Sequence, residues 1–179
     1  VYVSVSMAAV VPAADAQTLR LVGTLGNSGE SGPSMVRFAG PTAAGMGPVF
    51  DDAQALWERA GAAQLNRYAL DGRLLASFAL PGKADRNDQM TRAANLLVMK
   101  IGSALYTLPL NAEAGAKIKH LPGQADVLST RAFGNKVALL VKDDIVWLDP
   151  ATGERTRIVT PETRPQFLDV DPDGTVYAF

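Results

Sequence analysis

Short apolar runs, each about 4 to 7 residues long, recur along most of the chain and are separated by turn residues. The separators include Asp71-Gly72, Asp149-Pro150 and Asp173-Gly174, which are residue pairs typical of tight turns. No stretch keeps apolar residues at helical spacing for long enough to form a helix. The stretch DDAQALWERAGAAQL comes closest, but Gly61 interrupts it. The pattern therefore predicts an all-β fold built from short strands.

The sequence also repeats itself with a period of about 40 residues. Similar segments start at Ala55, Leu96 and Val137. An aromatic residue recurs within the repeats, at Tyr68, Tyr106 and Trp147. A proline closes each repeat, at Pro81, Pro122 and Pro161. Proline suits the end of an outer strand because it cannot donate a hydrogen bond to a further strand. Four antiparallel strands in about 40 residues is the size of one β-propeller blade.

The predicted fold class is therefore a β-propeller with four-stranded antiparallel blades in an incomplete ring. Blades are expected at about 41–81, 82–122 and 123–161, and another blade begins at 162–179. Residues 18–26 are a candidate closing outer strand. We interpret residues 17–179 as a propeller fragment of about three and a half blades.

Residues 41–78 resemble a blade of the NHL repeat family. The resemblance rests on a proline-led inner strand followed by an acidic turn, and on Asn66-Arg67-Tyr68 and Asp71-Gly72 in the expected places. The closing stretch DVDPDGTVYAF resembles the inner strand and acidic turn of another such blade. The resemblance covers roughly 18–179, and its motifs are structural rather than catalytic. It implies a propeller of usually about six blades.

The first 16 residues differ from the rest. They are uncharged and apolar through Val11, and Ala14-Asp15-Ala16 fits a signal-peptidase cut before Gln17. We interpret them as the remnant of a secretory signal peptide, which predicts an exported protein in the periplasm or outside the cell. The alternation VYVSVS also fits a buried first strand. The apolar run is too short to span a bilayer, so no membrane span is predicted.

Composition narrows the chemistry. The chain has 17 basic and 18 acidic residues and a net charge of −1, which gives no electrostatic case for nucleic acid. It has no cysteine, so disulfides and thiolate chemistry are excluded. Its single histidine, His120, is expected on an outer strand, away from the central channel.

A set of basic residues provides candidate ligand contacts. Arg59, Lys100 and Lys142 each precede the expected turn between the second and third strands of a blade. That turn lies on the same face as the loops between blades, where ligands usually bind propellers. Arg92 and Arg131 follow two of those loops and are expected on the same face. Arg59, Lys100 and Lys142 at equivalent positions would form an arc that attracts an anionic ligand, although basic residues at strand ends also keep edges soluble.

Asp169, Asp171 and Asp173 followed by Gly174 have the spacing of a calcium loop. Pro172 between the second and third carboxylates does not suit such a loop. In register with the repeat, the stretch joins the first two strands of a blade, and Pro-Asp-Gly favours a type I turn. We therefore expect a turn, with calcium as a weak alternative and no other cofactor.

These observations favour an exported scaffold that binds a protein, peptide or glycan on one face. The alternative is a propeller enzyme of the lyase or lactonase-type hydrolase class. Such an enzyme would need carboxylates, amides or imidazoles that point into the channel, and the visible inner strands offer few. We therefore expect binding rather than catalysis.

Overall fold

The structure is a computed structural model, and it describes residues 46–60, 63–83, 87–123, 126–142, 144–162 and 165–179. All regular secondary structure in these residues is β-strand. Blade 1 consists of β1 (Val49–Phe50), β2 (Leu56–Ala60), β3 (Gln64–Tyr68) and β4 (Leu74–Ala79). Blade 2 consists of β5 (Gln89–Ala93), β6 (Leu96–Ile101), β7 (Ala104–Pro109) and β8 (Lys119–Leu121). Blade 3 consists of β9 (Val127–Phe133), β10 (Lys136–Val141), β11 (Asp144–Leu148) and β12 (Arg155–Val159). Blade 4 is the hairpin of β13 (Leu168–Val170) and β14 (Val176–Ala178).

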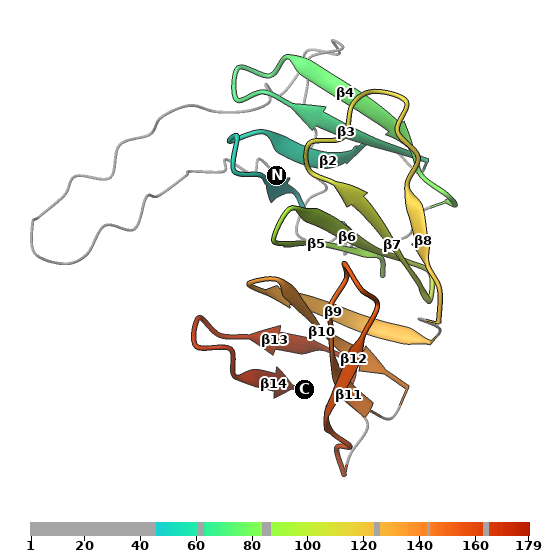
Figure 1. Cartoon of the computed structure of the whole chain (residues 1–179), viewed down its shortest axis with the longest axis vertical. Helices are drawn as coiled ribbons and strands as arrows, with labels where there is room; N and C mark the ends of the chain where they lie inside the picture. Colours follow the sequence, from blue (N-terminus) through green and yellow to red (C-terminus); the bar gives the residue numbers. More distant parts are fainter. Residues whose placement is uncertain (1–45, 61–62, 84–86, 124–125, 143, 163–164) are drawn as a thin grey trace, which may run out of the picture.

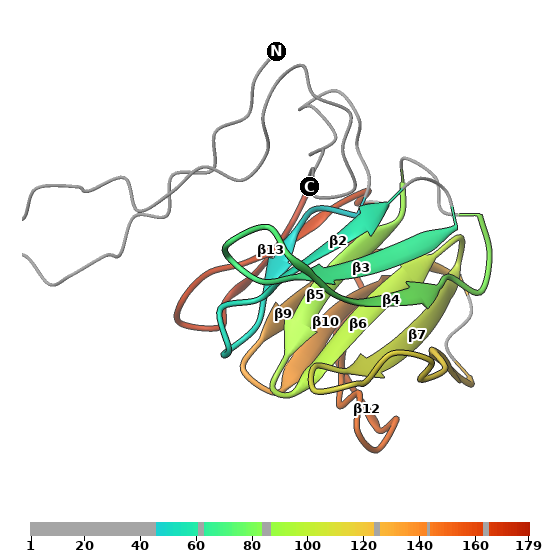
Figure 2. The same cartoon turned by 90° about the horizontal axis from the view of Figure 1, so that it is seen from above.

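Each of the first three blades is an antiparallel sheet whose strands lie side by side in chain order. The blades stack face to face along an arc, with blade 1 at one end and blade 4 at the other (Figure 1). Seen from above, the strands of successive blades lie one behind another (Figure 2). The first strands β1, β5, β9 and β13 are neighbours and form the inner side of the arc. The predicted arrangement of four-stranded blades is thus confirmed, while the candidate strand at 18–26 and the leader at 1–16 lie outside the described residues.

Antiparallel order sends the turns of each blade to two opposite faces of the arc. The first-turn face carries the turns that join first and second strands, at 51–55, 94–95, 134–135 and 171–175. The second-turn face carries the turns between second and third strands, together with the loops that lead from one blade to the next. A residue's place along its strand therefore decides which face it can serve.

Several hairpins use two-residue turns that need a left-handed backbone. Gly102 and Gly134 take φ values of 61° and 60° at the first turn position, which costs little without a Cβ atom. Ala94 and Lys142 adopt the same conformation without glycine, at φ values of 49° and 48°. Their left-handed backbone follows from the hairpin geometry of their blades.

Apolar side chains fill the spaces between blades. Between blades 1 and 2 the core includes Trp57, Leu65, Leu97, Met99 and Leu108, all fully buried. A second cluster joins blades 2 and 3, and a third joins blade 3 to the hairpin of blade 4. Because each sheet is buried on both faces, its inner residues do not follow a simple alternation of apolar and polar positions.

Buried hydrogen bonds also tie the inner strands together. The Gln89 side-chain carbonyl on β5 accepts bonds from the Thr130 backbone N–H, at 2.6 Å, and from its hydroxyl, at 3.2 Å. On β9, the strand that also carries Thr130, the Ser129 hydroxyl accepts a bond from the Leu168 N–H of blade 4, at 3.2 Å. These bonds satisfy backbone and side-chain groups that have lost contact with water, and they fix the height of one blade against the next.

The substitution Gln89→Leu tests the first of these ties. It removes the acceptor of two donors on Thr130, which is 1% exposed. We expect a loss of about 1–3 kcal/mol in the free energy of unfolding, measured by urea denaturation. Gln166→Leu, at an exposed position, serves as the control. Equal stability of the two variants would show that the tie contributes nothing.

Candidate functional site

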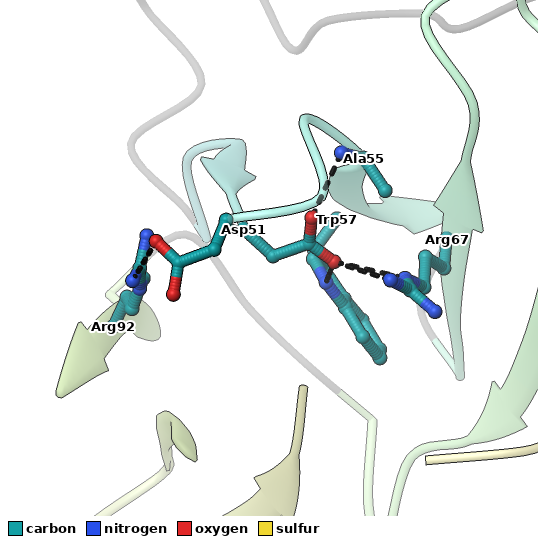
Figure 3. Close-up of polar contacts among 6 residues, drawn as sticks. Asp51, Ala55, Trp57, Arg67 and Arg92 are labelled. Atoms are coloured by element: carbon teal, nitrogen blue, oxygen red, sulfur yellow. Dashed lines mark hydrogen bonds and ion pairs between the residues drawn. The ribbon is translucent and has the colours of Figure 1, made fainter. Parts of the chain in front are cut away.

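The first turn of blade 1 is organised around the carboxylate of Asp51 (Figure 3). One oxygen accepts a bond from the Ala55 backbone N–H, at 2.8 Å. The other accepts bonds from Trp57 Nε1, at 3.1 Å, and from Arg67 Nη2, at 2.7 Å. Burial alone would raise the pKa of Asp51, but the bonds from Ala55, Arg67 and Trp57 and the charge of Arg67 outweigh it and lower the pKa. Asp51 is therefore an ionised, fully coordinated carboxylate.

Arg67 connects this turn to the core between blades 1 and 2. Its guanidinium carbon lies 5.5 Å from the centre of the Trp57 ring, in a cation–π contact. The same ring stacks on Phe78, with ring centres 5.5 Å apart. The acidic turn, the arginine and the tryptophan thus form one structural unit that orients blade 1 towards blade 2.

The hairpin of blade 4 repeats this arrangement with Asp171. Its carboxylate accepts bonds from the Thr175 N–H, at 2.8 Å, and from the Tyr177 hydroxyl, at 3.2 Å. The sequence offsets, four and six residues, equal those from Asp51 to Ala55 and Trp57. Hydrogen bonds, led by that from Thr175, lower the pKa of Asp171, and the bond to Asp171 raises the pKa of Tyr177. The predicted turn between first and second strands is confirmed.

The three aspartates of this stretch do not converge as calcium ligands would. Asp169 faces Arg131, with 3.6 Å between Oδ1 and Nε. Asp171 accepts the bonds of its own turn, and Asp173 contributes its backbone N–H to that turn at 3.0 Å. Among the described residues there is no group of three or more histidine, cysteine, aspartate or glutamate side chains placed to hold a metal ion.

Arg92 and Arg131 were expected beside the loops between blades, and this placement is wrong. Arg92 is the next-to-last residue of β5, close to the first-turn face, where it pairs with Asp52 of blade 1 (Figure 3). Its Nε also donates to the Ala94 carbonyl, at 3.1 Å. Arg131 pairs with Asp169 of blade 4. Both arginines lie near the end of an inner strand, close to the first-turn face. There they link neighbouring blades at the inner side of the arc.

Of the other three cations, two share one structural position. Arg59 and Lys100 are each the next-to-last residue of a second strand, and blade 3 has Leu140 there. Lys142 comes two residues later, within the turn itself. Lys100 is 4% exposed and donates from Nζ to the Asn87 carbonyl, at 2.8 Å. The second-turn face therefore has Arg59 and an exposed Lys142. Lys100 is instead hydrogen-bonded to the backbone of Asn87, in the loop that precedes β5.

His120 occupies the predicted position on an outer strand. It lies on β8, is exposed, and has its ring centre 5.3 Å from that of Tyr106. The Asp51 unit, by contrast, was not foreseen beyond the expectation of an acidic turn. The signal that would have found it is the matching order of Asp51, Ala55 and Trp57 and of Asp171, Thr175 and Tyr177.

Solved structures of similar shape agree with this architecture. The computationally designed Ika4 protein matches with a TM-score of 0.53 and 16% identity over 83% of this chain and 98% of its own. The structure of S. cerevisiae Dbp5 bound to Nup159, Gle1, IP6 and ADP matches with a TM-score of 0.54 and 13% identity over 78% of this chain. The WD40 domain of Neurospora crassa Pan2 matches with a TM-score of 0.50 and 10% identity over 76% of this chain.

WD40 repeats form propellers of four-stranded blades. The fold is a β-propeller. The chain covers 38% of the matched chain in the Dbp5–Nup159 structure and 43% of the Pan2 domain. Comparison with protein-family models and with curated protein sequences gives no match, so the NHL resemblance stays a prediction. No helix in the described part of the chain is long and apolar enough to cross a membrane.

Replacing Asp51 by asparagine tests the turn unit. The amide removes the negative charge from a site where Arg67 is 19% exposed and the aspartate 3%. We expect a loss of about 2–4 kcal/mol in the free energy of unfolding, since one partner of a buried ion pair remains. Asp71→Asn, in an exposed turn with a longer ion pair of 3.8 Å to Arg73, is the matched control.

The lowered pKa of Asp51 also fixes the pH range of this effect. Its contribution is present above the ordinary value of 3.8 and is lost as the pH falls from there towards the lowered folded pKa. The difference in the free energy of unfolding between wild type and Asp51→Asn should therefore become smaller at acidic pH. A gap that stays constant from pH 7 to below pH 3 would contradict the assignment.

Proposed function

We propose that this propeller is an exported scaffold that binds an acidic protein, peptide or glycan on its second-turn face. A propeller supplies a rigid frame from which loops of several blades reach one side, an arrangement suited to recognition. The observation that carries the proposal is topological. The loops between blades and the turns beside Arg59 and Lys142 all lie on the second-turn face.

Charge supports an acidic ligand on this face. Arg59 and Lys142 lie on blades 1 and 3, with the loop held by Lys100 between them in the chain. On the opposite face, Arg67, Arg92 and Arg131 form ion pairs with aspartates of their own or neighbouring blades. Those arginines serve the architecture of the first-turn face.

The comparisons support a binding role only in general terms. One matched structure contains Dbp5 bound to Nup159, so that propeller-like neighbour comes from a protein complex. A shared fold does not transfer a partner, and the ligand must be found from the chemistry of the face. Arg59 and Lys142 favour carboxylate-bearing or sulfated ligands over neutral ones.

A binding screen tests the acidic-ligand proposal. Wild-type protein is offered immobilised libraries of acidic, neutral and basic peptides and an array of sulfated and neutral glycans. We expect the acidic members to bind, and the double variant Arg59→Gln, Lys142→Gln to lower their affinity about tenfold or more. Lys136→Gln removes an exposed cation at the first-turn end of β10 and should leave affinity unchanged. Equal binding of acidic and neutral ligands, or equal loss in the control, would refute the proposal.

Export is tested separately by expressing the chain with a start methionine and a short basic segment, without a cleavage site of its own, placed before Val1. Terminal sequencing of the protein recovered from the periplasm or medium should start at Gln17, the residue after Ala14-Asp15-Ala16. Retention of residues 1–16 on a cytoplasmic product would support the alternative of a first strand.

A further inference from the structure

The hairpin of blade 4 matches the first hairpin of blade 1 in its register as well as in its turn. Trp57 on β2 lies opposite Val49 on β1, and Tyr177 on β14 lies opposite Asp169 on β13. In both turns the N–H of the central aspartate donates to the backbone carbonyl four residues later, at 3.0 and 3.1 Å. Tyr177 therefore occupies in blade 4 the structural position that Trp57 occupies in blade 1.

Blade 1 has a third strand beside this hairpin, whereas blade 4 has none among the described residues. Arg67 on that third strand lies opposite Trp57, and its Nε and Nη2 donate to Oδ2 of Asp51 at 2.9 and 2.7 Å. In the described part of the chain, Oδ2 of Asp171 accepts one bond, from the Tyr177 hydroxyl at 3.2 Å. The two carboxylates are thus held alike by their own turns, but only Asp51 has a guanidinium partner within the described residues.

The outer edge of β14 is suited to accept a further strand. β14 pairs with β13 along one edge, and no described strand pairs with the other, at the end of the arc (Figure 1). The strand carries neither a proline nor a charged side chain, which are common means of protecting a sheet edge. Val176 packs towards blade 3, so Tyr177 points to the opposite side, where it is 47% exposed. An extended peptide beside β14 would gain backbone hydrogen bonds and the ring of Tyr177.

The pairing in blade 1 indicates which side chains such a strand needs. The residue opposite Tyr177 would correspond to Arg67, whose guanidinium carbon lies 5.5 Å from the centre of the Trp57 ring. Two buried residues of β3, Leu65 and Tyr68, lie two positions before and one position after this arginine. The matching partner is therefore an extended segment in which an arginine lies between an apolar residue and an aromatic one.

We propose that the open edge of β14 binds an arginine-bearing extended segment of another polypeptide as a third strand, with the guanidinium on Asp171. Among the described strands, β3 has the required pattern, but it is already paired with β2 and β4. The site takes a basic partner on blade 4 and uses neither Arg59 nor Lys142. It is therefore independent of the face proposed above for acidic ligands.

Fluorescence anisotropy on the intact chain tests the proposal, with a labelled peptide of the sequence of residues 63–70, AQLNRYAL, as the probe. We expect this peptide to bind, and its Arg67→Gln form to bind about tenfold or more weakly. The protein is the same in both measurements, so a folding defect cannot explain the difference. Absence of binding, or equal affinity of the two peptides, would overturn the proposal.

Variants of the protein locate the site. Asp171→Asn keeps an oxygen that can accept the N–H bonds of the turn but removes the charge, and it should lower the affinity about tenfold. Asp173→Asn removes the same charge from an exposed position of the same turn and should bind as wild type does. The double variant Arg59→Gln, Lys142→Gln should also bind the probe normally, so the two binding proposals can fail separately. Equal losses in Asp171→Asn and Asp173→Asn would refute the guanidinium contact.

Hydrogen exchange measured by mass spectrometry separates strand addition from a charge contact alone. At a saturating concentration of the probe, amides of β14 should exchange several-fold more slowly, because a new strand protects the edge. Amides of β12, an exposed outer strand of blade 3, should not change. Binding without protection of β14, or equal protection of β12, would overturn strand addition at this site. Self-association of the chain that the probe reverses would show that a second copy supplies the strand, which would contradict the assignment to another polypeptide.

Discussion

Each blade of this protein needs a neighbour, because its sheet carries apolar side chains on both faces. Trp57 and Leu65 of blade 1 pack against Leu97 and Met99 of blade 2, and equivalent cores follow along the arc. Stability in such an array comes from interfaces between repeats as much as from each repeat. Apolar packing alone does not set the height of one blade against the next. The hydrogen bonds that the Thr130 N–H donates to Gln89 and the Leu168 N–H donates to Ser129 supply that directional constraint.

The sequence allowed the architecture to be predicted because the repeat period and the turn residues are local signals. The period of about 40 residues indicates a blade, and residue pairs such as Asp173-Gly174 indicate where strands end. The direction of individual side chains was harder to predict. Arg92 was assigned to the wrong face because its position within β5, rather than its distance from the loop, decides which face it reaches.

The basic residues illustrate a second difficulty: residues of the same charge and similar sequence context differ in burial and in hydrogen bonding once the chain is folded. Arg59 and Lys100 share a strand position, yet the ammonium of Lys100 is buried on a backbone carbonyl and Lys142 lies in an exposed turn. A one-residue shift of register moves a side chain to the other side of the sheet, and a blade-3 bulge between Leu140 and Val141 adds a further offset. Composition cannot show such differences, because they depend on pairing.

Lys100 and Glu58 are both buried charged residue types, but the fold treats them differently. Lys100 has the Asn87 carbonyl 2.8 Å from its nitrogen, so the backbone replaces part of its lost hydration. Glu58 has only desolvation acting on it, since its cross-strand partner Asn66 is bonded to Tyr68 and Ser77. A carboxyl can avoid the cost of burial by keeping its proton, an option that lysine has only by losing one. Burial therefore raises the pKa of Glu58 from 4.5 to about 8.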